Sequence, residues 1–294
     1  MYDIIIIGAG PSGMTAALYA KRANKNVLVL EALTPGGQII NANKIDNYPG
    51  LPGISGVDFA TNLYNQIIDL GVIVKFEKVI NIDYPKVVTN ENSYTGKAII
   101  IATGAEKRKI GILKEDYYLG RGLSYCATCD GNFYKDKVVC VYGSGNHALD
   151  DAMYLSDICK EVYLITRSDK FKGDETTLNS LNNKDNVHLV YNTVITKLLG
   201  DDMLNSIELN NSEIMNIDGL FVAIGQTPET QNFINILDLN EKGYAVTKDF
   251  RTKVKGIYVC GDVVDKPLRQ LATAIGDGAQ AATIAIQDIN NKVI

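Results

Sequence analysis

At 294 residues the chain is long enough for two domains, and its 21% charged and 46% hydrophobic residues are typical of a folded protein. A net charge of −5 disfavours nucleic acid and anionic membranes as partners, because both are bound through a basic face. No apolar run is long enough to cross a bilayer, and the short apolar start lacks the basic residues of a signal peptide. We therefore expect a cytoplasmic protein with no nucleic-acid or membrane partner.

Residues 1–31 have the order of a dinucleotide-binding unit, namely a strand, a glycine-rich loop, a helix and a second strand. Gly8 allows the tight turn, Gly10 lets the backbone approach a pyrophosphate, and Gly13 lets helix and strand pack closely. The helix amino end then faces the phosphates, and Glu31 can accept hydrogen bonds from a ribose. The elements expected are strands at 2–7 and 27–30 and a helix at 14–23.

Cys126 and Cys129 form a Cys-x-x-Cys pair, for which redox chemistry and metal binding are the two alternatives. A structural zinc site would need two more ligands at short spacing, whereas the histidines of this chain, His147 and His188, lie far from the cysteines and from each other in the sequence. We therefore predict a redox pair and no metal. Three further cysteines lie in apolar or helical patterns and are expected to be buried and inert; they are Cys140, Cys159 and Cys260.

Asp130 directly follows the second cysteine of the pair. Two thiols at this spacing can close a small disulfide, so that one exchanges with an outside disulfide and the other resolves the intermediate. A neighbouring carboxylate opposes a thiolate, and its useful role is proton transfer to or from the leaving sulfur. The alternative is a turn or cap residue. The sequence leaves open which cysteine attacks the partner, although we favour Cys129 as the thiol that faces the cofactor.

A second unit of the same plan begins at residue 138, with strands expected at 138–142 and 161–165 and a helix between them. Its loop carries Gly143, Gly145 and Asn146, with Ala148 as the third small residue. Both units finish alike, the first in Ala102-Thr103-Gly104 and the second in Ala223-Ile224-Gly225. Strands that alternate with helices predict an α/β fold with parallel sheets, built from two Rossmann-like three-layer domains.

The C-terminal stretch reads as a buried strand that ends in Gly261-Asp262, followed by a helix from about 268 to 290. An acid at the carboxyl end of a strand lies where open α/β sheets bind ligands. We therefore expect this stretch to return to the first domain, so that the second domain is inserted. The predicted boundaries are 1–112 and 242–294 for the first domain and 113–241 for the inserted one, with linkers near 110–113 and 239–243.

Together these motifs closely resemble the low-molecular-weight, bacterial-type thioredoxin reductases, from Gly8 to Ala282. The hexapeptide Cys126-Ala127-Thr128-Cys129-Asp130-Gly131 is the most specific of them. Reductases of the glutathione reductase type carry their cysteines just after the first strand–helix–strand unit, where this chain has none. The other matching segments are Gly8–Gly13, Pro35-Gly36-Gly37-Gln38, Asn47-Tyr48-Pro49-Gly50, Ala102-Thr103-Gly104, Ala223-Ile224-Gly225, Gly261-Asp262 and Arg269-Gln270.

The resemblance implies FAD on the first domain, a homodimer, and thioredoxin or a thioredoxin-like protein as the partner whose disulfide is reduced. The residues of the chain that it implies for FAD are Gly8, Gly10, Pro11, Ser12, Gly13, Glu31, Gly37, Gln38, Asn47, Ala102, Thr103, Gly104, Gly261, Asp262, Arg269, Gln270 and Leu271. Those it implies for a nicotinamide donor are Gly143, Gly145, Asn146, Ala148, Arg167, Lys172, Ile224 and Gly225.

The electron donor is where the chain departs from the family pattern. Family members carry a His-Arg-Arg run and a further Arg for the 2′-phosphate of NADPH, whereas this chain keeps Arg167, has Ser168, and offers Lys172. His147 stands where small residues are usual, as either a solvent-facing side chain or a partial block of the nicotinamide site. NADPH or NADH is favoured as donor. The alternatives are a ferredoxin-dependent flavin thioredoxin reductase and a flavin-binding redox sensor without turnover.

Overall fold

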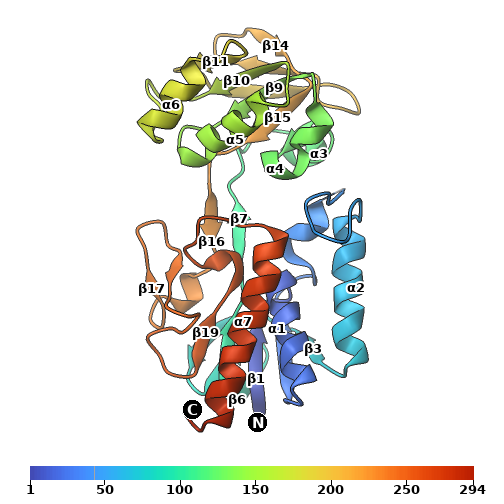
Figure 1. The fold of residues 1–294 in the computed structure, drawn as a ribbon, viewed down its shortest axis with the longest axis vertical. Coiled ribbons are helices and arrows are strands. Elements are labelled where there is room, and N and C mark those ends of the chain that lie inside the picture. Colours follow the sequence, from blue (N-terminus) through green and yellow to red (C-terminus); the bar gives the residue numbers. More distant parts are fainter. Residues whose placement is uncertain (43) are drawn as a thin grey trace. The chain divides into compact units, whose positions relative to one another are not determined.

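The computed structural model describes residues 1–42 and 44–294 and divides them into two compact units. Unit 1 comprises residues 1–106 and 227–294, and unit 2 comprises residues 107–226 (Figure 1). One unit is thus inserted into the other in sequence, as predicted. In the part of the chain that is described, no helix is long and apolar enough to span a membrane.

The unit boundaries differ from the predicted ones, and most clearly at the second linker. Strand β16 (Gln226–Pro228) pairs with β7 (Ala105–Lys107), so the chain re-enters unit 1 near residue 227. Phe233 and Leu237 then lie buried in the core of unit 1. The linker predicted at 239–243 therefore lies more than ten residues beyond the observed boundary. The reason is that apolar residues of 227–241 pack against strands that are distant in sequence.

Unit 1 is built on a sheet whose central strands are all parallel. An antiparallel extension, β5 (Lys86–Thr89) and β4 (Val79–Asp83), joins the amino-terminal half of β6. A small pair, β17 (Asp238–Leu239) and β18 (Ala245–Val246), stands apart from this sheet. The parallel strands run in the order β3 (Ile73–Phe76), β2 (Val27–Glu31), β1 (Tyr2–Ile7), β6 (Ser93–Ile101) and β19 (Ile257–Val259).

Both faces of this sheet are buried, which explains the unbroken apolar run of β1. Ile4 and Ile6 belong to one hydrophobic cluster, and Ile5 and Ile7 to the other, because successive side chains of a strand point to opposite faces. Helices cover the first face and the segment around residues 233–264 covers the second (Figure 1). The helices are α1 (Pro11–Arg22), α2 (Gly56–Asp69) and α7 (Leu271–Asn290).

Unit 2 has a fully parallel sheet with unlike layers on its two faces. Helices pack on one face through Val139 and Val141, and a three-stranded antiparallel sheet packs on the other through Cys140 and Tyr142. The parallel strands run β11 (Val187–Val190), β10 (Glu161–Ile165), β9 (Val138–Tyr142), β15 (Gly219–Val222) and β8 (Leu123–Ser124). The antiparallel strands are β12 (Ile195–Leu199), β13 (Ser206–Leu209) and β14 (Ile214–Asn216), and the helices on the first face are α4 (Ala127–Asp130), α5 (Asn146–Ser156) and α6 (Glu175–Asn182). Helix α3 (Glu115–Tyr118) packs through Tyr118 on the same face as the antiparallel sheet.

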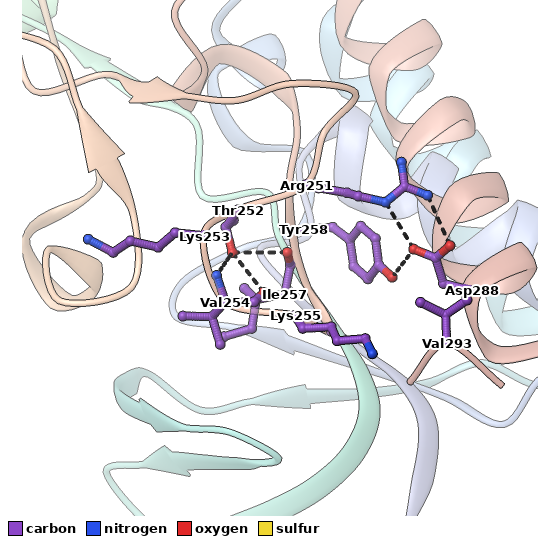
Figure 2. A pocket seen from close by; sticks show the side chains of 10 residues that line it. Arg251, Thr252, Lys253, Val254, Lys255, Ile257, Tyr258, Asp288 and Val293 are labelled. Atoms are coloured by element: carbon purple, nitrogen blue, oxygen red, sulfur yellow. Dashed lines mark hydrogen bonds and ion pairs between the residues drawn. The ribbon is translucent and has the colours of Figure 1, made fainter.

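A polar network ties the end of α7 to the sheet of unit 1 beside a cavity of about 220 Å³ (Figure 2). The carboxylate of Asp288 accepts hydrogen bonds from Arg251 Nε at 3.1 Å and Nη2 at 2.9 Å, and from the Tyr258 hydroxyl at 2.7 Å. None of the predicted cofactor residues lines this cavity. The network is therefore a structural brace, and it anchors the helix whose other end lies at the predicted flavin site.

We expect Asp288→Asn to destabilise the protein at pH 7 by about 1–2 kcal/mol, the range for a charge-assisted hydrogen bond with a partly exposed partner. The bonds from Arg251 hold the pKa of Asp288 below its usual range. A depressed folded-state pKa adds stability above the unfolded-state value, and this stability is lost as the pH falls through the folded-state pKa. Urea unfolding from pH 8 to pH 3 should therefore show the deficit shrinking at acid pH. The exposed Asp201→Asn serves as control, and a deficit independent of pH would contradict the prediction.

Candidate functional site

The carboxyl ends of the parallel strands gather the predicted FAD residues at one edge of unit 1. Because β1, β2, β6 and β19 are parallel and in register, the segments that follow them share that edge. These segments are 8–13, 102–104 and 261–262, and Glu31 is the last residue of β2. The predicted grouping of these segments is present in the structure.

The glycines of the first loop have the geometry that the fingerprint requires. Gly8 has φ +104°, and a Cβ placed on Gly13 would lie 1.9 Å from the Gly8 carbonyl oxygen, so neither position tolerates a side chain. A Cβ on Gly10 would meet nothing within 4 Å, so this stretch of backbone is open to a ligand. Pro11 begins α1, whose free N–H groups and positive end suit a pyrophosphate.

Glu31 is fixed by backbone donors on both of its oxygens. Oε2 accepts the amide of Ala9 at 2.7 Å, and Oε1 accepts the amide of Leu33 at 2.8 Å. The Gly36 amide in turn donates to the Ala9 carbonyl at 2.8 Å, which brings the segment with Gly37 beside the glycine loop. Each carboxylate oxygen has a second lone pair, so Glu31 can still accept from ribose hydroxyls.

Asp262 supplies a direct test of whether the edge fits FAD. Its Oδ1 is buried and has no hydrogen-bond partner among residues 1–42 and 44–294. Lys266 Nζ lies 3.4 Å away, within ion-pair distance, but no donor in the described part of the chain satisfies the oxygen by a hydrogen bond, and the ribityl hydroxyls of FAD are suitable donors. This oxygen, which lacks a hydrogen-bond donor among those residues, and the open backbone at Gly10 both fit the cofactor.

The amino end of α7 completes the edge. Gln270 caps the helix, and its Oε1 accepts from Asn47 Nδ2 at 3.0 Å, which joins two predicted flavin residues. Arg269 has a more structural environment than predicted, because its guanidinium donates to the carbonyls of Asp262 at 3.1 Å and Val264 at 2.9 Å. It also stacks on the ring of Tyr244 at 3.9 Å. Arg269 thus shapes the loop that carries Asp262.

For two other residues predicted to bind FAD, Thr103 and Gln38, the surroundings do not by themselves indicate a cofactor. The Thr103 hydroxyl donates to the carbonyl of Glu229 at 2.8 Å, where the chain re-enters unit 1. Gln38 lies in a 3₁₀ turn, η1 (Gly37–Asn41), with its side chain exposed. Neither the hydrogen bond of Thr103 nor the exposure of Gln38 indicates a cofactor contact.

The corresponding edge of unit 2 repeats the glycine geometry around the second predicted fingerprint. A Cβ on Gly143 would lie 2.3 Å from the Ala223 carbonyl oxygen and 2.8 Å from the Ala148 Cβ, whereas Gly145 is open. The Lys172 amide donates to the Ser144 carbonyl at 2.6 Å, so the segment after β10 folds back to this loop. Asn146 Oδ1 also accepts the amide of Asp174, at 2.7 Å. Ile224 and Gly225 follow β15 at the same edge, and the side chains of Arg167 and Lys172 are exposed.

His147 lies on the first turn of α5 and is 48% exposed, as the solvent-facing alternative predicts. Its Nε2 is 3.7 Å from Asp151 Oδ2, one turn along the helix. Burial raises the pKa of Asp151 to about 7. A carboxyl with a raised pKa, that of Asp151, therefore lies one helical turn from His147, on the helix that follows the glycine loop of unit 2.

Cys126 and Cys129 form a disulfide, with their Cα atoms 5.3 Å apart. The pair follows β8, which is parallel to β15 and β9, so it lies at the same edge of the sheet as the glycine loop of unit 2. Cys126 precedes the single turn of α4, and its carbonyl accepts the Asp130 amide at 3.1 Å. The structure thus places the redox pair within unit 2, as predicted.

Ser124 was not predicted, and it links the disulfide loop to the candidate proton carrier. Its hydroxyl donates to Asp130 Oδ2 at 2.5 Å and accepts the Cys126 amide at 3.0 Å. Burial raises the pKa of Asp130, and the hydrogen bond from Ser124 opposes that rise. A partly buried carboxyl with a raised pKa suits proton transfer at a sulfur better than a turn role. A lone serine two residues before the pair carries no signal in the sequence.

The remaining cysteines are buried, as predicted. Burial raises the pKa of Cys159 to about 11 and that of Cys260 to about 12, and it also raises the pKa of Cys140. Because the thiolate is the reactive form, these three thiols are inert at neutral pH.

Comparison with known proteins agrees with this geometry. The family model described as pyridine nucleotide-disulphide oxidoreductase matches residues 2–278. Thioredoxin reductase of Mycoplasma pneumoniae is 38% identical over 98% of this chain and 95% of its own, and that of Ureaplasma parvum is 39% identical over 99% and 98%. A crystal structure of thioredoxin reductase from Streptococcus pyogenes covers 99% of both chains with a TM-score of 0.92 and 35% identity. The chain therefore belongs to the pyridine nucleotide-disulphide oxidoreductase family, and within it to the low-molecular-weight thioredoxin reductases.

Proposed function

We propose that the protein reduces the disulfide of thioredoxin through Cys126 and Cys129, with FAD as cofactor and NADPH as electron donor. The observation that supports this most strongly is the disulfide at the carboxyl end of β8, beside the partly buried carboxyl of Asp130. Similarity along the whole chain to thioredoxin reductases supports the same partner. FAD, when bound, would pass the two electrons of the donor to the disulfide, which takes up two protons and becomes the dithiol.

Exchange with thioredoxin then needs only the residues of this loop. One thiolate of the reduced pair attacks a sulfur of the thioredoxin disulfide, which forms a mixed disulfide and releases one thioredoxin thiolate. The second cysteine attacks the mixed disulfide, so that Cys126–Cys129 reforms and thioredoxin leaves as a dithiol. Asp130 gives a proton to the departing thioredoxin sulfur, and it is reprotonated by the second cysteine thiol as that thiol becomes the attacking thiolate. Ser124 holds the Asp130 carboxyl toward this loop.

We assign FAD to the edge of unit 1 on the geometry around Gly10, Glu31 and Asp262. The glycine loop and the amino end of α1 would take the pyrophosphate, and Glu31 the adenosine ribose. Asp262 Oδ1 would accept from the ribityl chain. Asn47 and Gln270, which are hydrogen-bonded to one another, would approach the flavin ring together with the positive end of α7.

The donor site is proposed at the second glycine loop, where Arg167 and Lys172 are exposed cations after β10. Ser168 replaces one expected arginine, so the 2′-phosphate would meet one planar guanidinium and one ammonium. NADPH is favoured over NADH on these charges. We also propose that the protein acts in the cytoplasm, which the Cys-x-x-Cys pair supports, and that it forms a homodimer, which the family supports.

The test is to add NADPH, NADH or reduced ferredoxin anaerobically to the FAD-loaded protein and to follow flavin bleaching, with thioredoxin added afterwards. We expect NADPH to bleach the flavin fastest and thioredoxin to restore its colour. Arg167→Ala should raise the KM for NADPH about tenfold, the effect of one lost charge-assisted contact, and leave the KM for NADH nearly unchanged. Bleaching by ferredoxin alone would overturn the donor assignment.

A further inference from the structure

Lys266 is a largely buried cation at the predicted flavin edge, and the proposed function does not use it. Its side chain is 13% exposed, and its Nζ lies between two carboxylates of unit 1. Nζ is 2.7 Å from Asp277 Oδ2 and 3.4 Å from Asp262 Oδ1. A buried ammonium is costly unless it is paired, so this position is held by both acids together.

Asp277 holds Lys266 from helix α7. Its side chain is 15% exposed, and the same Oδ2 that binds Lys266 also accepts the backbone amide of Gly261 at 3.3 Å. Asp277 therefore fastens the segment 261–266 to the helix at both of its ends. We call Lys266 and Asp277 a clamp, and Asp262 lies between its two points of attachment, Gly261 and Lys266.

The clamp leaves one carboxylate oxygen of Asp262 able to accept a hydrogen bond. Its Oδ1 is buried and lacks a hydrogen-bond donor among the described residues, although Lys266 stands within ion-pair distance. Lys266 thus offsets the charge of Asp262 without occupying that oxygen as a hydrogen-bond donor would. Without the ammonium, the carboxylates of Asp262 and Asp277 would repel each other across the vacated space.

We propose that Lys266, held by Asp277, is a positioning residue that keeps Asp262 aimed at a hydroxyl of FAD. This inference rests on the proposed FAD site. It assigns a specific task to a residue outside the set predicted to contact FAD, through its ion pairs with Asp262 and Asp277. A lysine that only braced the fold would be replaceable by any change that restored stability.

The experiment measures FAD affinity of the full-length protein by fluorescence titration after the flavin has been removed, together with the melting temperature of the FAD-free form. Lys266→Met should raise the Kd for FAD at least about tenfold, the effect of one displaced hydrogen bond to a charged group. Lys266→Arg keeps the charge and should stay within about threefold of the wild type. The exposed Lys242→Met is the matched control and should leave the Kd unchanged.

A double variant separates positioning from bracing. Lys266→Met combined with Asp277→Leu replaces the ion pair by an apolar pair, which is often neutral for stability. We expect the melting temperature to recover in the double variant while the Kd for FAD stays as high as in Lys266→Met. Recovery of both quantities together, or tight FAD binding by Lys266→Met, would overturn the inference. A wild-type protein that does not bind FAD would instead refute the proposed function.

Discussion

Replacing Cys126 or Cys129 with serine is expected to lower thioredoxin reduction by at least about a thousandfold, because removing one member of a concerted pair loses nearly all of its function. Reduction of the bound flavin by NADPH should continue in both variants. The two cysteines form the single disulfide found among the described residues, and serine can neither form it nor exchange it. Stopped-flow bleaching of the flavin and a coupled thioredoxin assay measure the two halves separately.

Cys159→Ser is the matched control for these variants. Cys159 is a buried thiol of the same unit whose pKa is raised to about 11 by burial, so its loss should leave turnover unchanged. The two active-site variants should also differ from one another. A mixed disulfide that accumulates with thioredoxin in only one of them would identify the remaining cysteine as the one that attacks the partner. A Cys126→Ser protein with normal thioredoxin turnover would refute the exchange scheme.

Asp130→Asn is expected to slow the dithiol exchange by about a hundredfold, the lower range for loss of a general acid–base group. Burial raises the pKa of Asp130 above the ordinary carboxyl range. Its acid form is thus present below that raised pKa and is lost as the pH rises through it. In a plot of rate against pH, wild-type thioredoxin reduction should therefore fall on the alkaline side of that pKa. The Asp130→Asn profile should lack this alkaline limb.

The control for Asp130 is Asp136→Asn, an exposed carboxyl in the same unit, which should keep both the rate and the limb. Single-turnover reduction of thioredoxin from pH 4.5 to pH 9 gives both quantities. A full rate at every pH in Asp130→Asn would return Asp130 to the role of a turn residue. Loss of flavin reduction in this variant would point to a misfolded loop instead.

The sequence was most informative where a strand is fully buried. Strands at 2–7, 138–142 and 161–165 were predicted with the bounds that β1, β9 and β10 have in the structure. A parallel strand covered on both faces is a continuous apolar run, and the glycine loops mark where it ends. Helix starts were less certain, since α1 begins at Pro11 rather than residue 14, and α7 at Leu271 rather than 268. Backbone caps, which leave a weak pattern, set those ends.

The antiparallel strands at 79–89 and 195–216 were not predicted. They are short and half exposed, with Ile80 49% and Ile214 59% exposed, so neither a buried run nor a clean alternation marks them. Their stability comes from partners distant in sequence, as does that of residues 227–241. The second domain boundary was misplaced for the same reason, because burial of Phe233 and Leu237 depends on strands that lie far along the chain.

By itself the sequence determined the α/β class, the insertion of one unit in the other, the two glycine loops and the cysteine pair with its neighbouring acid. Each of these features depends on residues that are close together in the sequence, because a turn, a helix terminus or a small disulfide ring requires particular residues at short spacing. Only the tertiary structure decided that Ser124 contacts Asp130, that Arg269 binds the loop of Asp262, and that Lys266 stands between Asp262 and Asp277. Such contacts depend on side-chain direction and burial, which a linear pattern does not encode, and they set the electrostatics of the site.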